Sequence, residues 1–472
     1  MGVNSDNTNS DHGWLNMSQM PLVDAIRAHL SENKQQWHTP GHGHILPFDG
    51  SWLNWAYDLT EVGSLSPTTD HTDPISQSMR RMAEIFGVKR SWYSVQGASL
   101  PVTAAILAAT SRRGTSVIIE RTCHRSALSA LIIGGLHPHW IYPTEPFHGA
   151  CSGQIIEALT ANTAAIILTR PTYDGLASDI GPVIEAAHRL SVPVVVDEAH
   201  GAHWYGRRGY PTSALELGAD LVAHGAHKTE PVLTQAGLLH AQGDLIAVEE
   251  VDLWWNLLAT SSPSYLLMSS LDAYQALRRD QGWTSRWEVM ALQARELWHQ
   301  FSGINILQAQ IENRGDGTQV DPAKMTLIGD GSQIREVVER WGWAEKTEPG
   351  AVTLIFSPKG KLSVVHSMLS TLNYLAIKPA PQYLVMPKPI MQLTPREAFM
   401  RNSVSVGLQD AVGSVARRPL VPYPPGIPLV QPGEQITQDV INWVESWRTL
   451  HAGTIEGLDA EGDQEGRVWI VN

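Results

Sequence analysis

The stretch VPVVVDEAHGAHW, residues 192–204, joins a run of valines to an acidic segment that contains two histidines. A short, continuous β-branched run is typical of a strand that is buried on both faces of a parallel sheet. Three further runs predict strands of the same kind: TSVIIE (115–120), AAIILT (164–169) and ADLVAH (219–224).

Segments with the character of helices separate these runs. They comprise residues 100–114, 125–137, 152–160 and 181–190. The repeated alternation predicts an α/β fold, in which a mostly parallel sheet carries helices on both faces. Ligands of such folds bind at the carboxyl ends of the strands, so we expect the chemistry in the loops that follow them.

Two of these loops carry a carboxylate and an amine. Asp197 ends the valine run, and Lys228 follows the next predicted strand, so both side chains are expected in one crevice. This pair suits pyridoxal 5'-phosphate (PLP): the lysine forms a Schiff base, and the aspartate keeps the pyridine nitrogen protonated so that the ring accepts electrons.

Two further features fit such a site, although each has an ordinary explanation. Gly97, Ala98 and Ser99 precede an apolar helix, where backbone N–H groups favour a phosphate; a helix cap by Ser99 accounts for them nearly as well. His124 follows another predicted strand and is either a cofactor contact or a surface histidine.

The tetrapeptide His-Gly-Ala-His occurs twice, at 200–203 and 224–227, which raises the alternative of a zinc site. The sequence lacks the cysteine pairs and the His-Glu-x-x-His pattern that accompany such sites. We therefore expect no metal.

Ten short motifs, in order along the chain, resemble one family. They are HTPGHG (38–43), DLTE (58–61), RTCHRS (121–126), RPTYDG (170–175), VVDEAHGAHW (195–204), GADLVAHGAHKT (218–229), LTQAGLLH (233–240), TSSPSYLLMSSLDAY (260–274), LTPREAF (393–399) and YPPGIP (423–428). This set is similar to the ornithine/lysine/arginine decarboxylases, which are PLP-dependent enzymes of the aminotransferase fold (fold type I). The chain resembles the short form, without the N-terminal receiver-like domain of larger members.

The resemblance implies a reaction and a set of residues. The reaction is α-decarboxylation of arginine, lysine or ornithine to an amine and carbon dioxide. Catalytic roles fall to Lys228, Asp197, His124 and His200. The implied cofactor-binding residues are Gly97, Ala98, Ser99, His124, Asp197, Ala199, His200, His227 and Lys228. The resemblance also implies a homodimer, in which the partner chain completes each active site.

The sequence departs from the family pattern beside the lysine. Gly225 and Ala226 stand where Ser-Thr is usual, and Glu230 stands where an apolar residue is usual. The loss of two hydroxyls predicts looser phosphate binding. Two alternatives remain open: an aminotransferase or aldolase, for which Arg396 is the candidate carboxylate ligand, and a non-catalytic relative that binds the cofactor.

The amino-acid composition and the residue patterns of the remaining segments predict the partners, the cellular location, two further helices and the domain boundaries. The net charge of −13 disfavours nucleic acid and acidic membranes as partners, and two cysteines in 472 residues favour a reducing cytoplasm. We expect one long helix over 285–303 and another over 436–450. The predicted divisions are a disordered tail (1–15), an N-terminal arm (16–65), a PLP-binding large domain (66–285), a smaller α+β domain (286–455) and an acidic tail (456–472).

Overall fold

The computed structural model describes residues 20–32, 40, 55–301, 303–315, 317–381, 384–423, 426–450, 454–461 and 465–472. The predicted tail, 1–15, lies outside the described residues, as does most of the motif at 38–43. Within the predicted arm, the structure describes helix α1 (Pro21–Ser31) and the 3-10 helices η2 (Trp55–Tyr57) and η3 (Gly63–Leu65).

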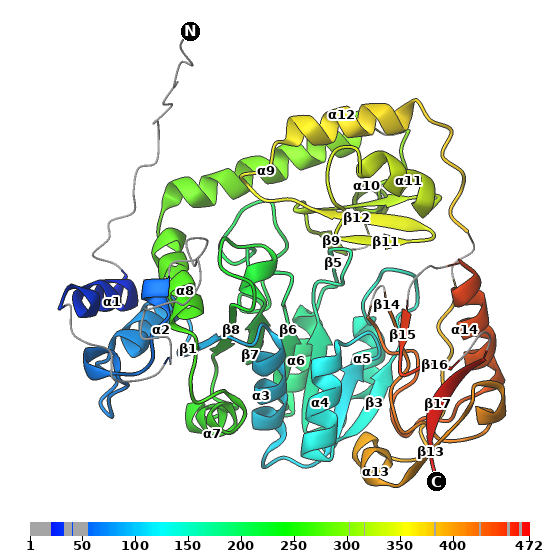
Figure 1. Cartoon of the computed structure of the whole chain (residues 1–472), viewed down its shortest axis with the longest axis horizontal. Coiled ribbons are helices and arrows are strands. Elements are labelled where there is room, and N and C mark those ends of the chain that lie inside the picture. The colour runs from blue at the N-terminus through cyan, green and yellow to red at the C-terminus, as the bar shows by residue number, and fades with distance from the viewer. Residues whose placement is uncertain are drawn as a thin grey trace.

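A seven-stranded sheet forms the centre of the molecule (Figure 1). Its spatial order is β1-β8-β7-β6-β4-β2-β3. The strands are β1 (Arg90–Ser94), β2 (Ser116–Glu120), β3 (His137–Ile141), β4 (Ala165–Thr169), β6 (Val194–Asp197), β7 (Leu221–His224) and β8 (Gly237–Ala241). The five strands from β7 to β3 are parallel, whereas β8 is antiparallel to both of its neighbours. The predicted fold class is confirmed, and all four predicted strands are present.

Helices cover both faces of the sheet, because successive side chains of each buried strand point to opposite sides. Val117 and Ile119 of β2 pack into one apolar cluster, and Ile118 packs into another. The first face carries α3 (Ser99–Thr110), α4 (Arg125–Gly134) and α7 (Val248–Leu258). The second carries α2 (Pro74–Ile85), α5 (Ser152–Ala158), α6 (Gly181–Arg189) and α8 (Tyr265–Arg278).

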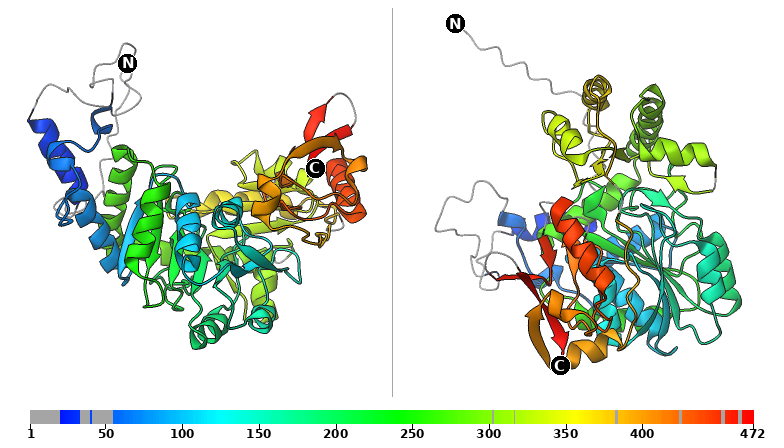
Figure 2. Two further views of the ribbon diagram at one scale, coloured as in Figure 1. Left: turned by 90° about the horizontal axis from the view of Figure 1, so that it is seen from below. Right: turned by 90° about the vertical axis from the view of Figure 1, so that its right-hand side faces the viewer.

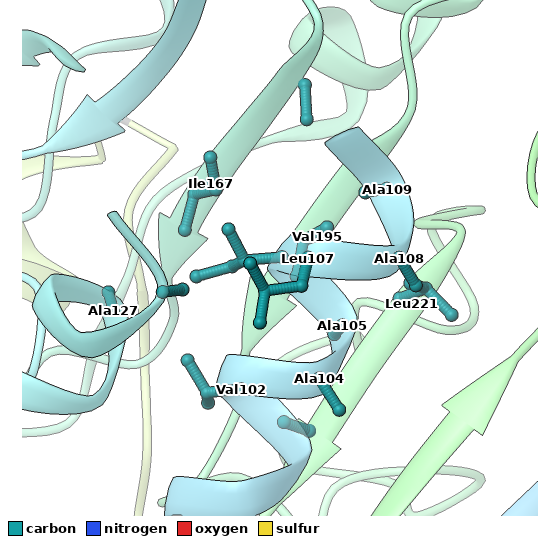
Figure 3. Close-up of a cluster of buried hydrophobic side chains, with 14 of the residues drawn as sticks. Val102, Ala104, Ala105, Leu107, Ala108, Ala109, Ala127, Ile167, Val195 and Leu221 are labelled. Carbon is teal, nitrogen blue, oxygen red and sulfur yellow. The ribbon is translucent and has the colours of Figure 1, made fainter. Parts of the chain in front are cut away.

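Helix α3 is apolar around its whole circumference because it lies at the centre of the first face. Figure 3 shows its Leu107 among Ile167 of β4 and Val195 of β6, with Leu221 of β7 near Ala108. Its burial fixes the start of the helix at the carboxyl edge of the sheet, beside the predicted cofactor site.

A second unit lies above the main sheet in Figure 1 and follows the long helix α9 (Gln281–Gln300), which was predicted over 285–303. It contains α10 (Leu307–Arg314), α11 (Gly331–Val338), α12 (Leu362–Asn373) and an antiparallel sheet of β10 (Lys324–Ile328), β12 (Ala351–Ile355) and β11 (Lys346–Glu348). The short strands β5 (Leu176–Ala177) and β9 (Gln319–Val320) pair the large domain with this unit.

The C-terminal unit (orange to red in Figure 2) lies at the opposite end of the molecule from α1 and α2. It contains α13 (Pro395–Met400), β13 (Ser403–Gly407), the 3-10 helix η5 (Gln409–Ala411), β14 (Val421–Tyr423), α14 (Gln438–Leu450), β15 (Thr454–Glu456), β16 (Asp459–Glu461) and β17 (Glu465–Val471).

The expectation of a loose acidic tail after residue 456 is wrong for the described residues. Strand β17 pairs with β13 over five residues, and Val468 is buried in the core of the C-terminal unit. The acidic residues precede a continuous apolar run, Val468–Val471, that forms the end of this strand. Among the described residues, no helix is both long and apolar enough to cross a membrane.

Candidate active site

A cavity of about 470 Å³ opens at the carboxyl ends of β2, β4, β6 and β7. Its volume lies within the range of small-molecule sites, roughly 300–1,000 Å³. All the residues predicted for the cofactor site line it: Gly97, Ala98, Ser99, His124, Asp197, Ala199, His200, His227 and Lys228. The sheet thus brings together segments that are 131 residues apart in the chain, from Gly97 to Lys228 (228 − 97).

Asp197 lies at the base of the cavity because the register of the sheet places it there. It pairs with Thr169 of β4 and Ala223 of β7. Its side chain is buried, and its Oδ1 accepts a hydrogen bond from the N–H of Ala199 at 3.1 Å. A carboxylate held in this way can receive a protonated ring nitrogen without moving.

A second buried carboxylate, Glu120, ends β2 beside this group. Its two oxygens accept hydrogen bonds from the N–H groups of Ala150 and Thr169, both at 3.1 Å. Burial raises the pKa of Glu120 to about 7, and the nearby charge of Asp197 adds to the rise. Glu120 holds the cavity-lining Thr169 in place.

Lys228 supplies an amine that can capture an aldehyde, close to Asp197 in the cavity. It ends the 3-10 helix η4 (Ala226–Lys228), and its Nζ lies 2.9 Å from Nε2 of His200. Burial lowers the pKa of Lys228, opposed by the charges of Asp197 and Glu345. Burial also lowers the pKa of His200 well below its usual value, so this imidazole is neutral and accepts the hydrogen bond. The site therefore raises the fraction of nucleophilic, uncharged amine above that of a lysine in water.

His124 is the N-cap residue of helix α4 and lines the cavity. Its Nδ1 accepts a hydrogen bond from the N–H of Ser126 at 3.2 Å and lies 2.9 Å from the hydroxyl of the same serine. Burial lowers its pKa, with Asp197 acting in the opposite direction. The ring is therefore fixed by its cap and is neutral in the cavity.

The start of α3 has the features of an anion site. Ala98, at the cap of the helix, has no side chain that could bond the first N–H groups. Gly97 adopts a φ of +63°. Gly237 packs closely against it, because a Cβ on Gly237 would lie only 2.4 Å from the carbonyl oxygen of Gly97. His227 donates from Nδ1 to the carbonyl of Ala236 at 2.9 Å, which orients its ring at the same wall. Free N–H groups at a helix start favour a phosphate.

The four histidines of the repeated tetrapeptide have four different environments. His200 contacts Lys228, and His227 contacts a backbone carbonyl. His203 Nε2 lies 3.1 Å from Asp321, and His224 Nε2 lies 2.9 Å from Glu198. In the part of the chain that the structure describes, no group of three or more His, Cys, Asp and Glu side chains could hold a metal ion.

The two small residues before Lys228 do not face the cavity. Ala226 is fully buried in the apolar core on the second face of the sheet. A Cβ on Gly225 would lie 2.9 Å from the carbonyl oxygen of Ala199 and 3.2 Å from Cδ of Lys228. A side chain at Gly225 would therefore crowd the lysine loop, and a hydroxyl at Ala226 would lie in the apolar core; the looser phosphate binding expected from the sequence stays a prediction.

Glu230, the third departure from the family pattern, has a structural partner. Its carboxylate accepts hydrogen bonds from Arg207 at 2.6 Å and from the indole of Trp283 at 3.2 Å. The side chains of Glu230 and Arg207 are both completely buried. The glutamate thus replaces an apolar residue because a buried guanidinium faces it.

Arg396 lies outside the cavity. It donates from Nη1 to the carbonyl oxygens of Ile132 and Ile133, at 3.3 and 2.6 Å, at the end of α4. This contact stabilises a helix terminus. The arginine considered for an aminotransferase is therefore engaged elsewhere.

Several cavity residues had not been assigned a role from the sequence. Tyr173 and Thr234 lie within motifs that carried the family resemblance, so the signal for them was present. Lys346 and Glu348 come from β11 of the second unit, and Gly426 comes from the C-terminal unit. All three lie more than a hundred residues beyond Lys228, and only the fold brings them to the site; Gly426 lies in the motif at 423–428, whereas Lys346 and Glu348 lie in none of the ten motifs.

Comparison with known proteins gives a consistent result. Residues 20–299 match the major domain of the Orn/Lys/Arg decarboxylases, and residues 379–471 match the C-terminal domain of the same family. The chain is 28% identical to an arginine decarboxylase of Bacillus subtilis (97% of this chain, 98% of that protein). It is 29% identical to an arginine decarboxylase of Halalkalibacterium halodurans (90% of this chain, 93% of that protein).

The fold also matches a solved structure. The lysine decarboxylase of Francisella novicida superposes with a TM-score of 0.79 at 18% identity. The match covers 96% of this chain and 81% of that one.

Proposed function

The chain belongs to the Orn/Lys/Arg decarboxylase family of PLP-dependent enzymes, and on this premise we propose that it decarboxylates arginine to the corresponding amine and carbon dioxide. The observation that carries the proposal is the buried amine of Lys228, which is hydrogen bonded to a neutral His200 in the cavity that Asp197 closes at its base.

The residues present fit the cofactor. Lys228 would carry it, Asp197 would pair with its pyridine nitrogen, and His124 would border the ring. The uncapped start of α3 at Gly97–Ser99, together with His227, would hold the phosphate. Bound PLP supplies an electron sink for the electron pair that the departing carboxylate leaves on Cα.

Side chains that line the cavity stabilise charge, transfer the proton and orient the reacting groups. The carboxylate of Asp197 stabilises positive charge at the base of the cavity. Lys228 Nζ holds and returns a proton at Cα, and His200 Nε2 keeps this amine oriented by accepting its hydrogen bond. The aromatic and aliphatic walls exclude water, which favours loss of a charged carboxylate.

Arginine is the proposed substrate because two arginine decarboxylases match this chain over more than nine-tenths of their own length. Lysine is the second candidate, supported by the fold of the lysine decarboxylase from Francisella novicida. The engagement of Arg396 with the end of α4 disfavours the aminotransferase alternative. We also propose a homodimer, and a cytoplasmic location in view of the free thiols Cys123 and Cys151.

Purified protein reconstituted with PLP tests the proposal. We expect arginine to yield carbon dioxide and the corresponding amine, and borohydride to fix the cofactor on the peptide that contains Lys228. The Asp197→Asn variant should lose at least about tenfold in kcat/KM, because a charge-assisted contact is worth roughly 1.5–3 kcal/mol.

The surface variant Asp244→Asn, whose carboxylate is 96% exposed, serves as the control and should behave as wild type. Cofactor fixed at another lysine, or full turnover by Asp197→Asn, would contradict the site assignment. Turnover with neither arginine nor lysine would contradict the proposed reaction.

A further inference from the structure

A cluster of charged side chains forms the wall of the cavity that the second unit contributes. Strand β11 brings Lys346 and Glu348 to this wall, where they line the cavity together with Asp174. The ammonium of Lys346 lies 2.9 Å from Asp174 and 3.2 Å from Glu348. Two carboxylates therefore share one ammonium group.

Asp174 has more hydrogen-bond partners than Glu348 and is more deeply buried. Asp174 also accepts hydrogen bonds from the hydroxyls of Thr353 at 2.7 Å and Thr326 at 3.4 Å, and it is nearly completely buried. Glu348 retains 18% side-chain exposure, and its ion pair with Lys346 is the longer of the two. Glu348 is thus the carboxylate of this pair that has room for another cation.

The surrounding charges do not remove the excess negative charge. A second ammonium, Lys324, is buried nearby; it donates to the carbonyl of Tyr173 at 2.6 Å and is attracted by the carboxylates of Asp321 and Asp174. Glu345 adds a further carboxylate, which accepts the hydroxyl of Tyr173 at 2.6 Å. Burial and the charge of Asp174 raise the pKa of Glu348, against the effect of Lys346. An added cation would relieve this repulsion.

A single aromatic ring separates this wall from the reactive amine. The ring of Tyr173 lies 4.9 Å from the ring of His200, which contacts Lys228. The same ring lies 5.2 Å from the ammonium of Lys346. A substrate held at Lys228 can therefore extend its aliphatic chain along Tyr173 toward the carboxylate of Glu348 on β11.

The other acidic groups that line the cavity are less suitable. Glu145 already pairs with the guanidinium of Arg314 at 2.6 Å. Asp197 lies at the base of the cavity, where it is held by the N–H of Ala199.

We propose that Glu348 binds the cationic end of the substrate and that Tyr173 supports its aliphatic chain. A guanidinium matches a carboxylate with two parallel hydrogen bonds, which an ammonium cannot provide, so this contact favours arginine over lysine. The inference rests on the proposed function, since it assumes that the α-amine is held at Lys228.

The test is the affinity of the holoenzyme for agmatine, measured by calorimetry without turnover. The Glu348→Gln variant should bind agmatine roughly 10- to 150-fold more weakly, because one hydrogen bond between charged groups is lost. Its KM for arginine should rise by a similar factor, with a smaller change in kcat. The matched control is Glu145→Gln, which removes a carboxylate from the same cavity and should change agmatine affinity less than about threefold.

Cofactor content, read from the visible absorbance, should be unchanged in both variants, which separates a specificity role from damage to the cofactor site. If Glu348→Gln lost the cofactor, Glu348→Leu would be measured instead, because it also removes the carboxylate; wild-type agmatine affinity in that variant with intact turnover would overturn the inference. Equal agmatine affinity in wild type and Glu348→Gln, with arginine still decarboxylated, would overturn the inference alone. A wild-type holoenzyme that neither binds agmatine nor decarboxylates arginine would overturn the proposed function and the inference with it.

Discussion

At the scale of single residues, the reactivity of Lys228 depends on what surrounds its amine. Burial disfavours the ammonium form, whereas the charge of Asp197 favours it, and burial has the larger effect. The neutral His200 accepts a hydrogen bond without adding positive charge. Because of this balance, the Lys228 amine becomes uncharged, and so able to attack an aldehyde, at a lower pH than the amine of a lysine side chain in water.

This balance predicts a pH dependence of cofactor capture. Only the neutral amine attacks the aldehyde, so the rate at which apo-protein binds PLP should rise with pH and level off above the pKa of Lys228. Because that pKa is lowered from about 10.5, the plateau should begin below the pH expected for a free lysine. In Asp197→Asn the plateau should move to lower pH still, since the variant removes a charge that raises the pKa. Stopped-flow absorbance measures the rate; a plateau that moves to higher pH in this variant would contradict the assignment.

The site residues of the large domain could be predicted from the sequence because each ends a strand, lies in the loop that follows one, or precedes a helix. Asp197, Lys228 and His124 are of this kind, and all three line the cavity. The side-chain direction at Gly225 and Ala226 could not be predicted in this way. A loop that turns through a 3-10 helix points consecutive side chains in different directions, and a motif gives the order of residues without their orientation.

At the scale of elements, the parallel strands were predictable because both of their faces are buried, which leaves a continuous apolar run. Strand β3 was not, since it lies at the edge of the sheet, where half-exposed residues and Pro138 are tolerated. Strand β1 at the other edge begins with Arg90 and also lacks an apolar run. The signal of β3 is weak because the strand is half exposed, whereas β1 is mostly buried but lacks an apolar run because Ser91 and Ser94 are polar.

A buried ion pair joins the end of β2 to the C-terminal unit. Nη2 of Arg121 lies 2.9 Å from Glu434, and both side chains are fully buried. The same guanidinium donates to the carbonyl oxygens of Pro428 and Leu429, at 2.7 and 3.0 Å. This contact holds the segment that includes Gly426 and Ile427 at the cavity wall.

Removal of one partner should therefore destabilise the protein strongly. Glu434→Gln leaves the guanidinium of Arg121 buried without a counter-charge, at a cost of about 3–5 kcal/mol, so the urea midpoint of unfolding should fall. The control is Glu456→Gln, which removes an exposed ion pair with Arg125 between the same two parts of the chain, 51% and 60% exposed. That change should cost less than about 1 kcal/mol. Equal shifts of the two midpoints would show that the buried pair does not join the units.

At the scale of the whole molecule, the cavity is a product of three parts of the chain. The large domain supplies Asp197 and Lys228, the second unit supplies Glu348, and the C-terminal unit supplies Met386 and Gly426. Sequence patterns show local periodicity and which strands are neighbours. They therefore predicted the site residues of the large domain, but not those of the second unit or of the C-terminal unit. The convergence of distant segments depends on tertiary packing, which no local pattern encodes.

The predicted homodimer has a candidate surface on the large domain. Leu253 and Leu257 lie one turn apart on α7 and are 60% and 70% exposed, while Trp255 on the same helix is buried. The exposed segment 260–262 follows this helix, within one of the motifs of the family resemblance, and does not line the cavity of its own chain. Two exposed leucines beside such a segment are typical of a surface that a second copy covers.

We expect the protein to sediment as a dimer, and its activity per chain to fall on dilution, because we propose that the partner chain completes each site. The double variant Leu253→Asp with Leu257→Asp should sediment as a monomer and lose activity, since two charges cannot be buried unpaired at the interface. Leu190→Asp, on the opposite face of the sheet and 46% exposed in the present structure, is the control and should remain an active dimer. Analytical ultracentrifugation across a concentration series separates the outcomes. A double variant that stays dimeric would place the interface elsewhere, and a monomeric variant with full activity would show that each chain completes its own site.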